Sequence, residues 1–446
     1  MTLASPPNVI YLHSHDTGRH VQPYGHAVPT PAIQRLAEQG ILFRRAFATA
    51  ATCSGSRAAL LTGQYPHVNG MTGLAHRGWE LNDVGQHLTH TLRTAGYHSE
   101  LIGEQHVSET PAVLGYDRVH EIESNHVATV APLAVDALQR PMPEPFFLSV
   151  GFFETHRRFF EPTSDRDERY ALPPANLPDL PQVRRDMAHF LASARSLDDG
   201  VDQVLRALDR TGLAERTLVI FTTDHGLPFP GAKATLFDRG LGVSLIVRGP
   251  GGFRGGRVEE QLVSHLDIYP TLCDLAGIEH PPYLQGSSLL PLVRGEVDRL
   301  HDELFAEITF HAAYEPQRSV RTERYRLIRR FDTLDGPVLP NVDDGPTKDA
   351  LVELGWFGWA GEEERLHDVL LDPGEAHNLI AEPAYAPVAR DLRRRLHGWM
   401  VETDDPLLDG PVELPPRGRA NSPHQYSAEE PILELGSELV DDDLAA

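Results

Sequence analysis

"PNVIYLHSHDTG", residues 7–18, is the stretch that decides the fold. Its apolar part, NVIYL, is short and rich in residues that favour strands, which is typical of a strand buried in a parallel sheet. Directly after it come His13, His15 and Asp16, which can bind protons or metal ions. The stretch therefore predicts a buried strand whose carboxyl end carries reactive side chains.

The same pattern recurs along the chain as far as about residue 278. Apolar runs alternate with segments of helical spacing, and these runs lie at 41–47, 98–103, 145–153, 217–224 and 243–251. The alternation predicts an α/β fold with a mostly parallel central sheet sandwiched by helices, as in alkaline phosphatase. Later in the chain, strands with short connections predict a smaller C-terminal α+β subdomain containing an antiparallel sheet.

Three regions follow from these changes of pattern. We expect a catalytic α/β domain over residues 1–299, the α+β subdomain over 300–403, and an acidic, proline-containing tail over 404–446. The tail's composition predicts an irregular and partly mobile arm. In the subdomain, Arg321, Arg324 and Arg326 alternate, which is typical of a solvated strand face.

The composition restricts the class of partner. The net charge of −24 argues against nucleic acid, because binding phosphates requires basic patches. No apolar run approaches the roughly 20 residues of a membrane span, and the N-terminus lacks the pattern of a secretory signal. We therefore expect a cytoplasmic protein that does not contact a membrane; the oligomeric state is not indicated. An anionic substrate would require a local cluster of cations.

Reactive side chains follow several of the predicted strands. In open α/β sheets, ligands bind at the carboxyl ends of the strands. The residues found there are His15, Asp16, His106, Glu154, His156, Arg157, Asp224 and His225. Any one histidine is more often an ordinary hydrogen-bonding group, and Asp-Gly turns are common in loops. Carboxylates and imidazoles from several strand ends together favour a divalent cation site.

Cys53 lies in "TCSGSRAALLTG", residues 52–63. A single free cysteine is usually a small buried apolar residue. Here small polar residues precede a run that can form a helix, and Ser54 or Ser56 could cap it. Cys53 would then lie at a helix N-terminus close to Arg57. Backbone N–H groups and the helix dipole favour an anion there, either a thiolate or a bound oxyanion.

These motifs together resemble those of the sulfatase family in the alkaline phosphatase superfamily. "CSGSRAALLTG" (53–63) is similar to the sulfatase signature, "PNVIYLHSHDTG" to the first-strand motif, and "TTDHG" (222–226) to the second metal motif. The matches occur in order to about residue 400. "DHGLPFPGAKATLFDRG" (224–240) is most similar to the sulfamidase, or N-sulfoglucosamine sulfohydrolase, branch.

The resemblance implies hydrolysis of a sulfate ester or N-sulfate, on a saccharide or another small molecule. Cys53 would be converted to formylglycine by the formylglycine-generating enzyme, and its hydrate would bind one divalent metal ion, usually calcium. The implied metal-site residues are His15, Asp16, Cys53, Asp224 and His225. Arg57 matches the arginine that holds the hydrate, and His106 a base for sulfate release. His156 matches a general acid, and Lys233 a residue that contacts sulfate.

Three positions depart from the family pattern. Gly55 replaces a proline in the segment that the converting enzyme reads. His15 replaces an aspartate, which shifts the metal preference towards manganese or zinc. Glu104 replaces a lysine and would repel sulfate. It could point away, pair with a cation such as Arg157, or meet a positive group on the substrate.

Substrate contacts are predicted for Lys233, His156, Glu104, Arg157 and His311. His311 could line the pocket mouth together with Tyr314 and Arg318, or these three could belong to a plain sheet surface. Two alternatives to a sulfatase stay open. One is a phosphodiester or phosphonate monoester hydrolase of the same superfamily, which a histidine-rich metal site would suit. The other is a non-catalytic binding protein in which Cys53 is not converted.

Overall fold

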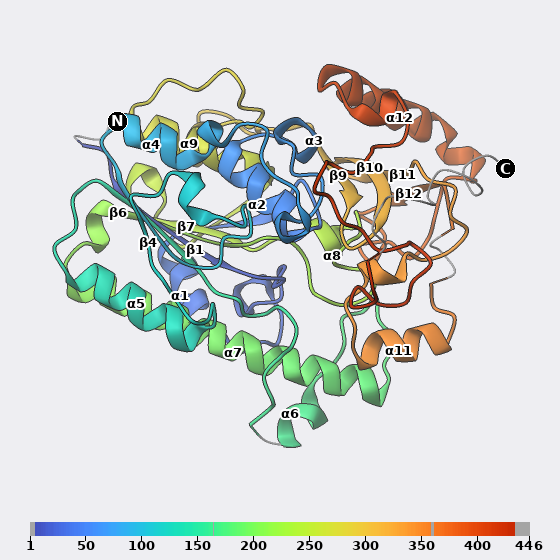
Figure 1. Ribbon diagram of the computed structural model, residues 1–446, viewed down its shortest axis with the longest axis horizontal. Helices are drawn as coiled ribbons and strands as arrows, with labels where there is room; N and C mark the ends of the chain where they lie inside the picture. The colour runs from blue at the N-terminus through green and yellow to red at the C-terminus, as the bar shows by residue number, and fades with distance from the viewer. Residues whose placement is uncertain (1–4, 164, 358–360, 433–446) are drawn as a thin grey trace.

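The computed structural model of the chain describes residues 5–163, 165–357 and 361–432 (Figure 1). Its large sheet has eight strands in the order β4-β3-β5-β1-β6-β7-β2-β8. These strands are β1 (Asn8–Ser14), β2 (Ile41–Phe47), β3 (His98–Gly103), β4 (Arg118–Val119), β5 (Phe146–Gly151), β6 (Thr217–Thr223), β7 (Leu245–Arg248) and β8 (Arg257–Ser264). β7 pairs antiparallel with both of its neighbours, and the other pairings are parallel. The predicted mostly parallel sheet is confirmed.

β1 lies in the interior of the sheet, between β5 and β6, and all of its residues are buried. Successive side chains of a strand point to opposite faces. Val9 and Tyr11 accordingly pack into the apolar core on one face, whereas Ile10 and Leu12 pack into the core on the other. Burial on both faces explains why the sequence of β1 is continuously apolar instead of alternating. The carboxyl ends of β1, β5 and β6 meet at one edge of the sheet.

Helices cover both faces of the large sheet (Figure 1). One layer contains α2 (Cys53–Thr62), α4 (Leu88–Thr94) and α9 (Ile268–Ala276), and the other contains α1 (Pro31–Gln39), α5 (Val127–Gln139) and α7 (Pro181–Arg210). The shorter helices are α3 (Pro66–Asn69), α6 (Asp165–Tyr170), α8 (Asp238–Leu241) and α10 (Leu290–Val293). Within the described ranges, no helix combines the length and the apolar character that crossing a bilayer requires.

A second, smaller sheet follows in the chain, as the sequence predicts. Its antiparallel strands, in the order β12-β11-β10-β9, are β9 (Glu303–Phe310), β10 (Tyr314–Thr322), β11 (Tyr325–Arg330) and β12 (Glu364–Asp368). The long helix α12 (Ala386–Glu402) packs its Leu392, Leu396 and Trp399 against this sheet. Helix α11 (Pro346–Glu353) lies between β11 and β12 in the chain and contacts α7.

The alternating arginines of β10 and β11 do not form the predicted solvated face. Arg321 and Arg326 are opposite each other in the register and both are buried. Both donate hydrogen bonds to the carboxylate of Asp238 in α8. Arg324, whose side chain is 45% exposed, is the one of the three that reaches solvent. The prediction was wrong because this face of the small sheet lies against the α/β body.

The tail after α12 is irregular, as predicted, but its described part up to residue 432 is docked on the body. Asp405 is buried and forms an ion pair with the buried Arg318 of β10, in which Asp405 Oδ2 lies 2.5 Å from Arg318 Nε. The backbone N–H of Asn421 donates to the carbonyl oxygen of Ala312 at 2.8 Å. The described part of the tail therefore contacts the body, and the partial mobility of the arm stays a prediction. Residues 433–446 lie outside the described residues.

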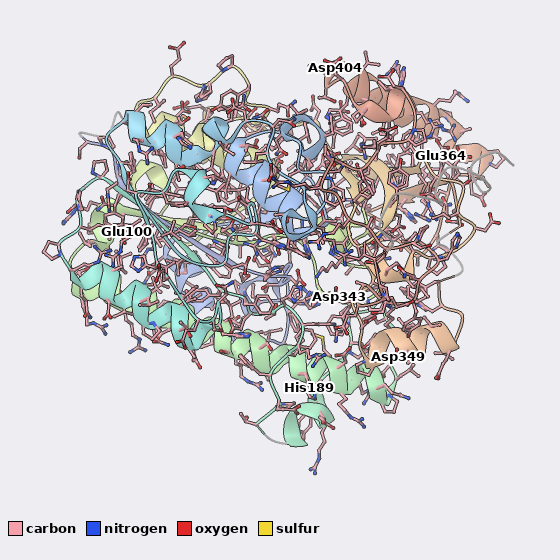
Figure 2. All side chains as sticks on the ribbon, viewed as in Figure 1. Glu100, His189, Asp343, Asp349, Glu364 and Asp404 are labelled. Atoms are coloured by element: carbon pink, nitrogen blue, oxygen red, sulfur yellow. The ribbon has the colours of Figure 1, made fainter. Side chains whose placement is uncertain are left out.

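The pair formed by Asp405 and Arg318 yields a prediction about stability. Asp405→Asn removes the nearer of two carboxylates and leaves the buried Arg318 guanidinium with Glu307 alone, at 3.4 Å, so we expect the free energy of unfolding to fall by up to about 3–5 kcal/mol. Denaturant unfolding measures this change. Asp404→Asn is the matched control, because Asp404 is the exposed neighbour (Figure 2). Equal effects of the two substitutions would contradict the assignment.

Candidate active site

Helix α2 begins at Cys53, with Thr52 in the N-cap position, so neither Ser54 nor Ser56 caps it as predicted. The two serines instead hold the helix in place. Ser54 accepts a backbone N–H from the loop after the helix, and Ser56 donates to the carbonyl oxygen of Asp224 at 2.5 Å. Cys53 is thus fixed, fully buried, at the N-terminal end of a helix whose dipole favours negative charge.

The residues predicted to bind metal come together around Cys53. Donor atoms of His15, Asp16, Cys53 and Asp224 all lie within 4.8 Å of one another. The Nε2 atom of His225 lies 3.3 Å from Cys53 Sγ and 3.2 Å from Asp16 Oδ1. Asp16 has a left-handed φ of 57° immediately after β1, and its N–H donates to Asp224 Oδ1 at 2.8 Å. This hydrogen bond joins the segments that follow β1 and β6.

This donor set fits a divalent cation. Asp16 and Asp224 are two buried carboxylates side by side, and a cation would compensate their charge. The Nδ1 atom of His15 lies 2.9 Å from Asp16 Oδ1 and 3.1 Å from Asp224 Oδ2. Nitrogen donors among oxygen donors widen the choice of metal beyond calcium.

Arg57 lies one helical turn after Cys53 and points into the same site. Its Nη2 donates to Asp224 Oδ2 and to the carbonyl oxygen of Ser14, both at 3.0 Å. Burial lowers the pKa of Arg57, but the carboxylates of Asp224 and Glu104 raise it above its usual value. Arg57 therefore remains charged in the interior and fixes Asp224.

Lys233 provides a second buried cation. Its Nζ donates to Asp16 Oδ2 at 2.8 Å and to Asp343 Oδ2 at 3.0 Å, and lies 3.2 Å from His156 Nε2. Asp16, His156 and Asp343 form a group with the spacing of metal ligands. The Lys233 ammonium contacts all three members, so it occupies the position that a second metal ion would take.

Asp343 was missed by the sequence reasoning. It lies between the turn η8 (Leu339–Asn341) and α11, 110 residues from Lys233 in the chain. Its neighbours in the sequence, Asp344 and Gly345, give it the character of an ordinary turn. Burial raises the pKa of Asp343, but the Lys233 ammonium, assisted by neighbouring imidazoles, lowers it to about 2. The carboxylate is therefore ionised.

The predicted base His106 also lies at the site. His15, Cys53 and His106 form another group whose donor atoms are within 4.8 Å of one another. Burial lowers the pKa of His106 to about 4, with a smaller opposing effect from Cys53. Its Nε2 lies 2.7 Å from Nδ1 of His76, which the sequence reasoning also missed. Nothing near His76 in the sequence marks it as reactive.

The thiol of Cys53 lies in an environment that favours a negative charge. Burial alone would raise the pKa of this thiol. The nearby Lys233 ammonium and His15 imidazole nevertheless lower it well below its usual value. Two buried cations, Arg57 and Lys233, therefore lie close to Cys53, and each of them is paired with a carboxylate.

Glu104 and Arg157 do not pair. Glu104 Oε2 accepts a hydrogen bond from Asn125 at 2.6 Å, whereas the Arg157 guanidinium donates to both carboxylate oxygens of Asp186 in α7 at 2.8 and 2.7 Å. Arg157 also stacks on Phe229. Of the alternatives for Glu104, pairing with Arg157 is therefore wrong.

His311 differs from the other two residues proposed for the pocket mouth. It directly follows β9, is buried, and is near enough to Asp343 to help lower the pKa of that carboxyl. Tyr314 accepts a hydrogen bond from the N–H of Val412 in the tail. Arg318 is fully buried on Asp405. Neither is placed to line the mouth, whereas His311 lies beside the site.

Comparison with known proteins agrees with this geometry. The sulfatase family model matches residues 7–278, and the model of the N-sulphoglucosamine sulphohydrolase C-terminal region matches residues 229–350. The chain belongs to the sulfatase family. This sulfatase is 31% identical to human N-sulphoglucosamine sulphohydrolase over 92% of each chain. It is 28% identical to an ulvan-active sulfatase of Formosa agariphila, covering 93% of this chain and 84% of that one.

Solved structures of sulfatases share the fold. A 2-O GAG sulfatase superposes with a TM-score of 0.74 at 22% identity, covering 96% of this chain and all of that one. A protein solved with its substrate D-glucosamine-2-N,6-O-disulfate gives a TM-score of 0.71 at 18% identity, covering 90% of this chain and 99% of that one. The family model and the 31% identical human relative, with which this fold agrees, make the chain a sulfatase-type hydrolase, acting on sulfate esters or sulfamates.

The position of Glu104 generates a prediction about substrate binding. Its charge acts on Arg57, and it would therefore repel a sulfate bound near that guanidinium. Glu104→Gln keeps an oxygen for Asn125 but removes the charge, so we expect KM for a sulfated substrate to fall roughly fivefold, about 1 kcal/mol. Steady-state kinetics at low salt measure this, with the exposed Glu109→Gln as control. A raised KM would contradict the repulsion.

Proposed function

We propose that this sulfatase removes a sulfate group from a saccharide, using a formylglycine derived from Cys53 and one divalent cation. The observation that carries the proposal is the convergence of His15, Asp16, Asp224 and His225 on the Cys53 side chain at the start of α2. The saccharide is supported by relatives, because the similar human and Formosa agariphila proteins are named for sulfated sugars.

A formylglycine at position 53 would supply a hydroxyl nucleophile for sulfur, and a divalent cation would supply Lewis acidity and positive charge. Asp16, Asp224, His15 and His225 would hold the cation. Arg57 would hold the Cys53-derived side chain, since it lies one turn further along the same helix. Proximity and fixed orientation of these groups lower the barrier.

Lys233 and His156 act on the substrate side. The Lys233 ammonium would bind a sulfate oxygen by exchanging one of its three present contacts for it, and would stabilise the charge of that oxygen as the bond to the leaving group breaks. His156 Nδ1 lies 2.5 Å from the carbonyl oxygen of Arg157. That contact keeps a proton on Nδ1 and leaves Nε2 to accept from Lys233 Nζ, 3.2 Å away, so the proton for the leaving group would come from the Lys233 ammonium by way of Nε2. The His156 side chain is 26% exposed, which supports assigning this step to the entrance of the site.

A phosphodiester or phosphonate monoester hydrolase is the second candidate. The two imidazoles, His15 and His225, among the cation-binding residues favour it. The chain is also 24% identical to a multifunctional alkaline phosphatase superfamily protein of Trinickia caryophylli, over 85% of this chain and 91% of that one. Parallel assays with an aryl sulfate and an aryl phosphonate monoester separate the two. A non-catalytic binding protein would turn over neither.

Conversion of Cys53 can be tested by mass spectrometry of its peptide. We expect the mass of the aldehyde or its hydrate when the chain is made with a formylglycine-generating enzyme. A Cβ at Gly55 would meet Thr52 Oγ1 at 3.1 Å and the carbonyl oxygen of Met71 at 3.2 Å, so glycine suits the tight fold of this segment. Gly55→Pro should raise the converted fraction, and Cys53→Ala should abolish turnover. Full activity with an intact thiol would refute the proposal.

The identity of the cation can be tested by elemental analysis. We expect one divalent ion per chain, and manganese or zinc in preference to calcium, because His15 and His225 contribute nitrogen. His15→Asp should shift the content towards calcium. Finding calcium alone in the fully active wild type would contradict the assigned preference.

A further inference from the structure

Asp343 places a carboxylate beside Lys233 and close to His156, the two residues proposed above to act on the substrate side. Its Oδ2 lies 3.0 Å from Lys233 Nζ, and the same ammonium lies 3.2 Å from His156 Nε2. The side chain of Asp343 is 16% exposed, whereas that of Asp16, on the inner side of Lys233, is fully buried. Figure 2 shows Asp343 between the α/β body and α11.

The segment that carries Asp343 is held on both sides. The Asn341 side chain is buried and accepts the N–H of Ala313 at 2.8 Å. Lys348 Nζ donates to the carbonyl oxygen of Val342 at 2.9 Å and to Asp344 at 2.7 Å. These contacts position the carboxylate before substrate arrives, and a preorganised group discriminates better than a mobile one.

A carboxylate in this position is unfavourable for a sulfate ester. When the S–O bond breaks, its electron pair passes to the bridging oxygen, which becomes more negative. A fixed negative charge nearby repels that oxygen in the transition state. The bridging oxygen also has no hydrogen to donate to the carboxylate. Asp343 would therefore slow hydrolysis of an O-sulfate.

The same carboxylate is favourable for an N-sulfate. The bridging nitrogen of a sulfamate carries an N–H, which a carboxylate accepts as a charge-assisted hydrogen bond. When this nitrogen takes up a proton, supplied by the Lys233 ammonium by way of His156 Nε2, it becomes positively charged. The S–N bond then breaks with its electron pair passing to nitrogen, the amine leaves, and sulfur bonds to the attacking oxygen. A negative group beside that nitrogen stabilises the charge that develops.

We propose that Asp343 is a specificity-determining residue that accepts the N–H of a sulfamate and selects N-sulfates over O-sulfates. This inference rests on the proposed function, because it assigns the leaving atom of the same reaction. Binding of the sulfate group does not require a carboxylate at this position, and the inference gives that carboxylate a role. Lys233 binds the sulfate group of both substrates, whereas Asp343 discriminates between a bridging nitrogen and a bridging oxygen.

The test compares two sugars that differ at the bridging atom, glucosamine 2-N-sulfate and glucose 2-O-sulfate. We expect Asp343→Asn to lower kcat/KM for the N-sulfate about tenfold to a hundredfold, the range for a hydrogen bond to a charged group. For the O-sulfate, kcat/KM should stay unchanged or rise. The decisive quantity is the ratio of kcat/KM for the N-sulfate to kcat/KM for the O-sulfate. Both substrates present the same sulfate group to Lys233, so a change in how the Lys233 ammonium binds sulfate cancels in this ratio. A partly unfolded preparation also leaves the ratio unchanged.

Glu353→Gln is the matched control, because it removes an exposed carboxylate of α11 that takes no part in holding Asp343. In this control, the ratio of kcat/KM for the N-sulfate to kcat/KM for the O-sulfate should equal that of the wild type. Equal losses on both substrates in Asp343→Asn, or a wild type that prefers the O-sulfate, would overturn the role of Asp343 while leaving the sulfatase function standing. Failure of the wild type on both sugars, with turnover of an aryl phosphonate monoester, would overturn the proposed function itself.

Discussion

The site depends on burying two carboxylates, Asp16 and Asp224, next to each other at the ends of two adjacent parallel strands. Like charges in a low-dielectric interior are strongly unfavourable unless they are compensated. Arg57 and Lys233 each donate to one of the carboxylates, and His15 and His225 fill the space between them. The buried cations, the imidazoles and the order of the strands are therefore parts of a single electrostatic requirement.

That requirement also explains how a chain with a net charge of −24 can accept an anion. Exposed charges more than roughly 10 Å away are largely screened at physiological ionic strength. The substrate therefore responds mainly to the local pocket, where Arg57, Lys233 and the helix N-terminus at Cys53 are concentrated. Glu104 and Asp343 modify this pocket from its edges.

The small sheet is attached to the body by buried ion pairs as well as by apolar contacts. Arg321 and Arg326 converge on Asp238, and Arg318 pairs with Asp405 at the start of the tail. The sequence shows these arginines as an alternating row but does not show which face of a strand is covered. Their partners come from α8 and from the tail, far away in the chain. For that reason the solvated face predicted from alternation was wrong.

Local pattern by itself determined the α/β architecture, the strands that carry chemistry at their carboxyl ends, and Cys53 at the start of a helix. These features depend on periodicity and on neighbours within a few residues, which a sequence displays directly. The residues expected to bind a cation could be predicted because parallel strands bring their carboxyl ends to one edge. Only the tertiary structure decided that Asp343 faces Lys233, that His76 touches His106, and that Arg157 is committed to Asp186. Each of these contacts joins segments separated by loops, and no local signal specifies how such segments pack.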